Sequence, residues 1–176
     1  MTLTVPQTLW RLRAGNRRFA SGSARGRREQ TPSGAPPLAA VVVCSDLGVR
    51  PESLFGVTAG ELVVLQTPGI RVGLAEATAC AMAREYRGVG LAIVLGHTAC
   101  PTVQTMQAGG GTGLFSRLVA EEVGEHRHDA CDDCESYLVA RMAGRLRELL
   151  VDCGDLAVVG AMLDSRSRTV SFMDAN

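Results

Sequence analysis

The chain of 176 residues has no lysine, few aromatic residues and no net charge. Its 18 basic residues, all arginine, are balanced by 18 acidic residues, so no overall field attracts nucleic acid or an anionic membrane. Aromatic residues make up 4% of the chain, too few for a platform on which bases stack. We therefore expect neither a nucleic-acid partner nor a membrane partner.

Long hydrophobic runs are also lacking. The longest fall far short of the roughly 18 residues that span a bilayer. The segment 1–19 carries Arg11 and Arg13 in place of the apolar stretch of a signal peptide. We expect a soluble, cytoplasmic protein, whose cysteines serve metal binding or packing rather than disulfides. The six cysteines are Cys44, Cys80, Cys100, Cys131, Cys134 and Cys153.

The length predicts a single domain. Residues 1–37 are predicted to form an N-terminal helix over 7–19 and a linker, and residues 38–176 an α/β core. The predicted strands cover 38–44, 61–66, 91–97, 156–163 and 169–173, and the predicted core helices cover 72–86, 102–107, 114–123 and 137–150. Short, uncharged, β-branched runs that alternate with helices predict an α/β fold with a mostly parallel central sheet flanked by helices.

Two of these strands end on soft metal ligands. Cys44 and Asp46 follow the run 38–43, and His97 and Cys100 follow the run 91–96. In open α/β sheets, sites form beyond the carboxyl ends of the strands, so two neighbouring parallel strands would bring Cys44, His97 and Cys100 together. Two thiolates and one imidazole are ligands that Zn²⁺ favours, and the fourth position is left for water or for the Asp46 carboxylate.

These residues resemble the β-class carbonic anhydrases, whose signature is Cys-x-Asp-x-Arg at one strand end and His-x-x-Cys at another. The likeness rests on Cys44-Ser45-Asp46 and His97-Thr98-Ala99-Cys100, and it extends to Gly15-Asn16-Arg17-Arg18-Phe19, Pro51-Glu52, Phe55 and the strand within 156–164.

The resemblance implies zinc-dependent hydration of carbon dioxide to bicarbonate, which is a lyase reaction. It implies Zn²⁺ on Cys44, His97 and Cys100, with Asp46 as a catalytic residue that is either a fourth ligand or a hydrogen-bond partner. It also implies that the protein is a homodimer or homotetramer.

The chain departs from the family pattern around this site. Gly48 stands where the family has its arginine, Ala35 where it has a glutamine, and Gln66-Thr67-Pro68-Gly69-Ile70 where it has Arg-Asn-Ala-Gly-Asn. In the family, the arginine can hold the aspartate away from the zinc by hydrogen bonds. Because Gly48 has no side chain to do so, the Asp46 carboxylate is free to become the fourth zinc ligand and exclude water. Arg50, two residues further on, is a weak substitute for that arginine. Three interpretations stay open: a weak carbon dioxide hydratase, a hydrolase of a related molecule such as carbonyl sulfide, and a non-catalytic zinc-binding homologue.

A second group of metal-binding side chains lies in an acidic segment and comprises His126, His128, Cys131 and Cys134. Its atoms suit a second, structural zinc, although the spacing is more compact than in a zinc finger. A redox pair is disfavoured, because the neighbouring aspartates raise the pKa of a thiol. The favoured interpretation is an acidic loop that enters the next helix.

Overall fold

The computed structural model describes residues 3–23, 36–107, 113 and 133–173. Its helices are α1 (Val5–Ala20), α2 (Pro51–Phe55), α3 (Leu74–Arg87), α4 (Pro101–Gln107) and α6 (Cys134–Leu149), with a short 3-10 helix η1 (Ser45–Leu47). Its strands are β1 (Ala39–Cys44), β2 (Leu62–Thr67), β3 (Leu91–His97), β4 (Ala157–Asp164) and β5 (Thr169–Phe172). The predicted elements within these ranges are confirmed, with ends that differ by a few residues. The helix predicted over 114–123 lies outside the described residues.

The strands form one sheet in the order β2-β1-β3-β4-β5. The pairs β1–β2, β1–β3 and β3–β4 are parallel, and β5 runs antiparallel to β4 at the edge. This topology confirms the expected α/β fold with a mostly parallel sheet. It also makes β1 and β3 direct neighbours, so their carboxyl ends lie side by side.

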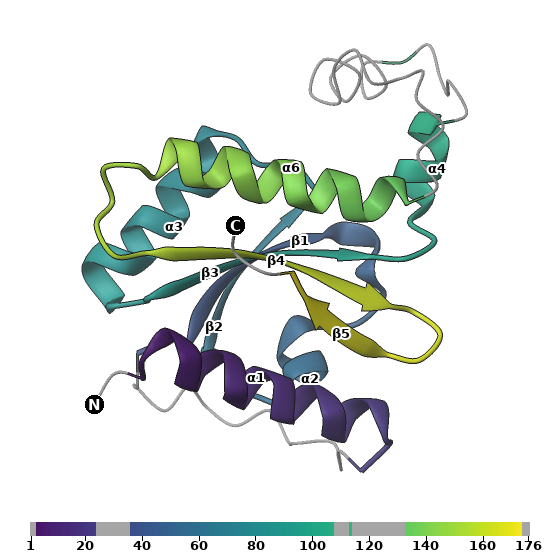
Figure 1. Cartoon of the computed structure of the whole chain (residues 1–176), viewed down its shortest axis with the longest axis horizontal. Helices are drawn as coiled ribbons and strands as arrows, with labels where there is room; N and C mark the ends of the chain where they lie inside the picture. Colours follow the sequence, from purple (N-terminus) through teal and green to yellow (C-terminus); the bar gives the residue numbers. More distant parts are fainter. Residues whose placement is uncertain (1–2, 24–35, 108–112, 114–132, 174–176) are drawn as a thin grey trace.

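Helices cover both faces of the sheet, with α3 and α6 on one face and α1 and α2 on the other (Figure 1). The side chains of β1 alternate between the two layers. Val42 and Cys44 belong to the core under α3 and α6, whereas Val41 and Val43 belong to the core under α1 and α2. Every residue of β1 and β3 is buried, which explains why these strands read as continuous apolar runs.

The N-terminal helix α1 packs closely against the rest of the chain. It begins with a capping box formed by Thr4 and Gln7. A Cβ atom on Gly15 would lie 1.6 Å from the Phe55 carbonyl oxygen, so only glycine allows this approach of α1 to α2. The buried Asn16 donates from Nδ2 to the Arg168 carbonyl (3.0 Å), and its Oδ1 accepts from the Val170 amide (2.8 Å). These bonds tie α1 to β5.

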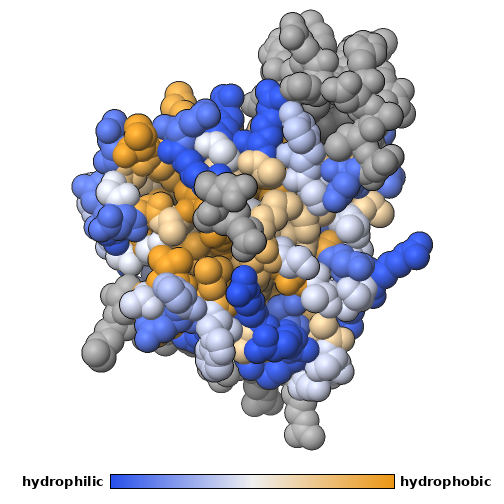
Figure 2. Space-filling model, in the orientation of Figure 1, coloured by the Kyte–Doolittle hydropathy of each residue, from blue (hydrophilic) through white to orange (hydrophobic). Residues whose placement is uncertain are grey.

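One edge of the sheet is only partly covered by a strand. β5 pairs with the second half of β4, from Ala161 to Asp164. In the first half, the guanidinium of Arg147 donates from Nε (3.2 Å) and Nη2 (3.0 Å) to the Val158 carbonyl, which would otherwise face outward. Figure 2 shows apolar side chains gathered across the middle of this side of the molecule, between α6 and α1. No helix in the described ranges is long and apolar enough to cross a bilayer.

Candidate metal centre

Cys44, His97 and Cys100 meet at the carboxyl ends of β1 and β3, as the sequence predicts. Cys44 and His97 are the last residues of their strands, and Cys100 immediately precedes α4. One potential ligand atom from each lies within 4.8 Å of the other two, and all three residues are buried. We call this group the Cys-His-Cys cluster. Within the described part of the chain, no other group of three or more such side chains converges in this way.

The two sulfur atoms of the cluster have a spacing that suits a shared metal. Cys44 Sγ and Cys100 Sγ are 3.6 Å apart, and both cysteines are free thiols. A disulfide would require a separation of about 2.0 Å. Two sulfur ligands on one tetrahedral zinc, each about 2.3 Å from the metal, are separated by about 3.8 Å. The observed distance is therefore close to that of a shared zinc and far from that of a covalent bond.

The ring of His97 is oriented by its neighbours. Nδ1 lies 3.2 Å from the Thr98 carbonyl oxygen, which also accepts a hydrogen bond of 3.1 Å from Ser165 Oγ. Because a carbonyl can only accept, Nδ1 carries a hydrogen, and in the neutral ring Nε2 keeps its lone pair. Nε2 is buried and has no hydrogen-bond partner in the structure. A buried nitrogen with a free lone pair beside two thiols fits a metal ion.

The turn between β4 and β5 holds the loop that carries His97 and Cys100. The Thr98 amide donates to the Leu163 carbonyl (2.9 Å), and the Ser165 amide donates to Thr98 Oγ1 (3.0 Å). Ala99 has a φ of 55°, a left-handed conformation that is uncommon for a residue other than glycine. The sequence analysis did not identify Ser165, because no local motif links it to a loop 67 residues away.

The close spacing of the three side chains in the cluster shifts the pKa of each of them. The hydrogen bond between the sulfurs lowers the pKa of Cys100 far below its usual range and raises the pKa of Cys44, so the two thiols titrate as a coupled pair. The neighbouring Cys100 raises the pKa of His97, although burial opposes this effect. Because a metal needs deprotonated thiols and a neutral imidazole, metal binding would displace protons from this cluster.

Asp46 lies beside the cluster, and its carboxylate is hydrogen-bonded to Thr102. Its amide donates to Cys44 Sγ (3.3 Å), and its Oδ2 accepts a hydrogen bond of 2.5 Å from Thr102 Oγ1. Gly48 follows η1 in the left-handed region, with a φ of 72°. Gly48 therefore offers Asp46 no side chain, and its backbone conformation is one that other residues rarely adopt. Arg50 is the N-cap residue of α2.

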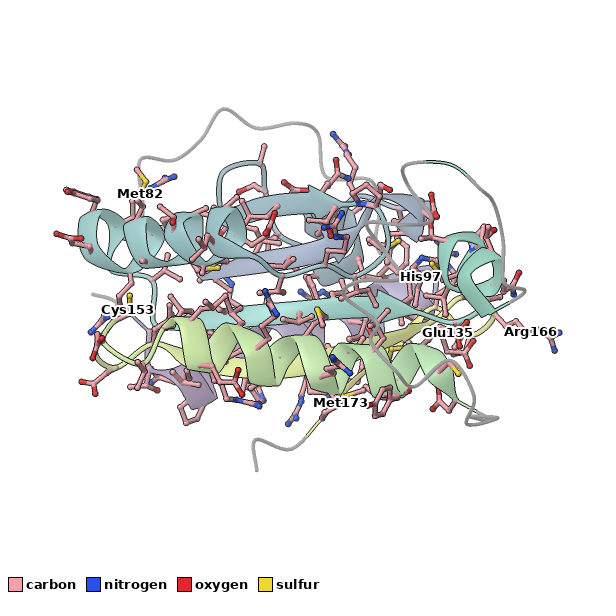
Figure 3. All side chains as sticks on the ribbon, turned by 90° about the horizontal axis from the view of Figure 1, so that it is seen from above. Met82, His97, Glu135, Cys153, Arg166 and Met173 are labelled. Carbon is pink, nitrogen blue, oxygen red and sulfur yellow. The ribbon has the colours of Figure 1, made fainter. Side chains whose placement is uncertain are left out.

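A second carboxylate also reaches the cluster. Glu135, in the first turn of α6, accepts a hydrogen bond of 3.3 Å from the Cys100 amide. Viewed from above, Glu135 and His97 lie at the same end of the sheet (Figure 3). This contact was not predicted, since Glu135 belongs to the acidic segment that we interpreted as a loop. Of the four side chains considered as a second zinc site, His126, His128 and Cys131 lie outside the described residues, and Cys134 begins α6 with a half-buried side chain.

The segment after β2 brings an apolar side chain close to the cluster. Thr67 Oγ1 donates to the Gly69 carbonyl (3.0 Å) and accepts from the Arg71 amide (3.1 Å), which closes a compact turn. This turn buries Ile70, and a Cβ atom on Gly96 would lie 2.6 Å from Ile70 Cδ1. Ile70 therefore packs on the backbone next to His97. Ala35 lies outside the described residues.

Comparison with known proteins finds similarity to carbonic anhydrases. The carbonic anhydrase family model matches residues 39–167. Carbonic anhydrase 2 of Mycobacterium tuberculosis (strain CDC 1551 / Oshkosh) is 31% identical over 134 residues, which cover 70% of this chain and 65% of that protein. A carbonic anhydrase of Mycolicibacterium smegmatis is 28% identical over 177 residues, which cover 94% of this chain and 81% of the relative. The first match thus spans just under two thirds of its relative's length.

Solved structures show the same fold. The β-carbonic anhydrase CafA of Aspergillus fumigatus superimposes with a TM-score of 0.68 at 19% identity, covering 93% of this chain and 89% of that one. The Coccomyxa β-carbonic anhydrase in complex with acetazolamide gives a TM-score of 0.63 at 19% identity, covering 90% and 78%. Since the family model matches most of the chain and the fold agrees, the chain belongs to the β-carbonic anhydrase family.

Proposed function

We propose that this protein is a zinc-dependent lyase that hydrates carbon dioxide to bicarbonate. The observation that carries the proposal is the buried Cys-His-Cys cluster, with the unpartnered His97 Nε2 facing two free thiols. We infer that Cys44, His97 and Cys100 hold Zn²⁺ and that Asp46 stands beside it as a catalytic residue. Family membership supports the reaction class.

The residues around the zinc have separate tasks in this proposal. Bound zinc supplies Lewis-acid activation of water near neutral pH. Cys44 and Cys100 act as thiolates, and the Thr98 carbonyl keeps His97 in the tautomer whose Nε2 can bind metal. The carboxylate of Asp46 accepts a hydrogen bond from the reacting water and orients it, which is worth more in a fixed geometry than in solution.

Carbonyl sulfide is a second candidate substrate. Its hydrolysis, like the hydration of carbon dioxide, needs attack of water on the central carbon of a linear molecule. Ile70 stands where the family pattern has an asparagine, and it packs against the backbone beside His97. An apolar wall at this point suits the large, polarizable sulfur atom that carbonyl sulfide carries in place of one oxygen. Zinc binding without catalysis is the third outcome to be tested.

We further propose that the protein acts as a homodimer or homotetramer in the cytoplasm. Three large side chains on α3, those of Leu74, Met82 and Tyr86, are more than half exposed. Their spacing of four and eight residues places them on one side of the helix, as expected for a surface that meets another subunit. The five described cysteines are free thiols, which supports a reducing compartment.

The decisive experiment is stopped-flow hydration of carbon dioxide with metal-quantified protein, from neutral to alkaline pH. We expect a rate that follows zinc content and rises with pH. Zinc-loaded protein with no rate above the buffer would reject the hydratase. The same sample would then be tested for release of hydrogen sulfide from carbonyl sulfide, and a second negative result would indicate a non-catalytic zinc protein.

A further inference from the structure

Asp46 and Thr102 make a second contact between the two segments of chain that carry the cysteines. Thr102 Oγ1 donates to Asp46 Oδ2 at 2.5 Å. Each residue lies two positions beyond a cysteine of the cluster, and the sulfurs of those cysteines, Cys44 and Cys100, are 3.6 Å apart. The two segments are thus in contact once through the cysteine sulfurs and once through a hydroxyl and a carboxylate.

The position of the Asp46 carboxylate matters because its tether to the cluster is short. Ser45 alone separates Asp46 from Cys44, and the Asp46 amide donates to the Cys44 sulfur. A carboxylate oxygen is itself a good zinc ligand. A rotation of this side chain toward the cluster would therefore compete with water for a metal held there, and Gly48 has no side chain that could restrain it.

We propose that Thr102 is a positioning residue that keeps Asp46 turned away from a metal on Cys44, His97 and Cys100. One coordination position then stays open to small molecules. This inference rests on the proposed metal centre, and Thr102 acts through Asp46. In this chain, a neutral hydroxyl from the first turn of α4 replaces the charged side chain that the family pattern places after Asp46.

The local structure presents the Thr102 hydroxyl from a defined place. Pro101 is the first residue of α4, where its preset φ suits a helix start, so Thr102 lies in the first turn. Its side chain is half-buried, and its β-branched Cβ restricts χ1. Asp46, by contrast, is exposed on a short 3-10 turn. The more constrained partner therefore fixes the less constrained one.

The strength of the hydrogen bond between Thr102 and Asp46 predicts how far its loss would shift Asp46 toward a bound metal. A hydroxyl offers a single hydrogen bond, whereas an arginine can grip a carboxylate with two and adds opposite charge. A single hydrogen bond to a charged group shifts an equilibrium by about 10- to 100-fold. Removal of the Thr102 hydroxyl should therefore move Asp46 toward the metal to a measurable extent.

The test uses the full chain loaded with Co²⁺, with thiocyanate as the probe for an open coordination position. Thr102→Val removes the hydroxyl at nearly constant shape, and Thr102→Ser keeps it. We expect Thr102→Val to weaken thiocyanate binding, followed by visible absorption, by about 10- to 100-fold. Thr102→Ser should bind as the wild type does. Adding Asp46→Asn to Thr102→Val removes the competing carboxylate and should restore binding.

The possible results separate this inference from the proposed function. Equal thiocyanate affinity in the wild type and Thr102→Val, both stoichiometrically loaded with Co²⁺, overturns the role of Thr102 and leaves the metal centre standing. Weakened binding that Asp46→Asn does not restore also overturns it, because Thr102 would then act on the loop and not through Asp46. A wild-type chain that binds no Co²⁺ overturns the metal centre and this inference together.

Discussion

Cys44 Sγ and Cys100 Sγ lie 3.6 Å apart although 56 residues separate them in the sequence. Their proximity follows from the pairing of β1 with β3, which aligns Val43 with Leu95 and so places the ends of the two strands together. Burial then removes both thiols from water, with His97 as the third member of the group. This arrangement is the basis of the proposed zinc centre, and its consequences can be tested.

Replacement of Cys100 by alanine is expected to abolish stoichiometric zinc binding. Loss of a partner that merely orients a metal ligand already weakens binding by about 10- to 100-fold, so loss of a ligand should exceed this. The measurement is zinc content after dialysis against a weak chelator. Cys153→Ala is the matched control, because Cys153 lies at the opposite end of the sheet from His97 (Figure 3). Full zinc content in Cys100→Ala would refute the ligand assignment.

Gly48→Arg is expected to raise the rate of carbon dioxide hydration about 10-fold, the effect of one charge-assisted hydrogen bond to Asp46. A Cβ at residue 48 meets nothing closer than the Asp46 carbonyl oxygen at 4.0 Å, but the φ of 72° makes any side chain unfavourable by about 1 kcal/mol. Gly48→Ala carries the same backbone strain without the guanidinium, so the comparison is between these two variants. Equal rates in the two would show that the missing arginine does not limit activity.

Gly15→Ala is expected to destabilise the fold by about 3 kcal/mol or more, at the upper end of what overpacking costs. The new Cβ would lie 1.6 Å from the Phe55 carbonyl oxygen, so α1 and α2 would have to separate. Gly144→Ala is the control, since a Cβ on this glycine of α6 meets nothing within 4 Å. That change should stabilise the protein by about 0.5–1 kcal/mol. Urea denaturation measures both, and similar effects of the two changes would contradict the close packing of α1 on α2.

Glu61 should make stability depend on pH in the acid range. Burial raises the pKa of Glu61, but hydrogen bonds from the Thr58 amide (2.6 Å) and Thr58 Oγ1 (2.7 Å), together with the ion pair to Arg11, outweigh it and lower the pKa below its usual 4.5. A lowered pKa stabilises the fold fully above pH 4.5, and this contribution is lost as the pH falls through the folded value.

Glu61→Gln should therefore be less stable than the wild type at pH 7, and the difference should shrink below about pH 4.5. Thermal melts across pH 3–7 provide the measurement, with Glu85→Gln, a change at an exposed position of α3, as the control. A difference that stays constant down to pH 3 would show that the Glu61 carboxylate gains nothing from its partners.

The sequence was sufficient to predict the strands, and together with the family resemblance it predicted the cluster. Runs of buried β-branched residues mark β1 and β3, and residues at the ends of neighbouring parallel strands must meet at one edge of the sheet. The adjacency of β1 and β3, which are not consecutive along the chain, was an assumption that the structure confirmed. The helix α1 was equally predictable from its apolar spacing, but not its close contact with α2 through Gly15.

Tertiary structure decided which side chains surround the cluster. Thr102 meets Asp46, Ser165 meets Thr98, and Glu135 meets Cys100, across sequence separations of 56, 67 and 35 residues. Hydrophobic periodicity specifies which face of a strand or helix is buried, but it carries no information on how loops beyond the strand ends approach one another. Those contacts depend on backbone conformation, as in the left-handed Gly48 and Ala99, and on the packing of distant elements. For this reason the sequence determined where a metal can bind, and the folded chain determined what holds Asp46 beside it.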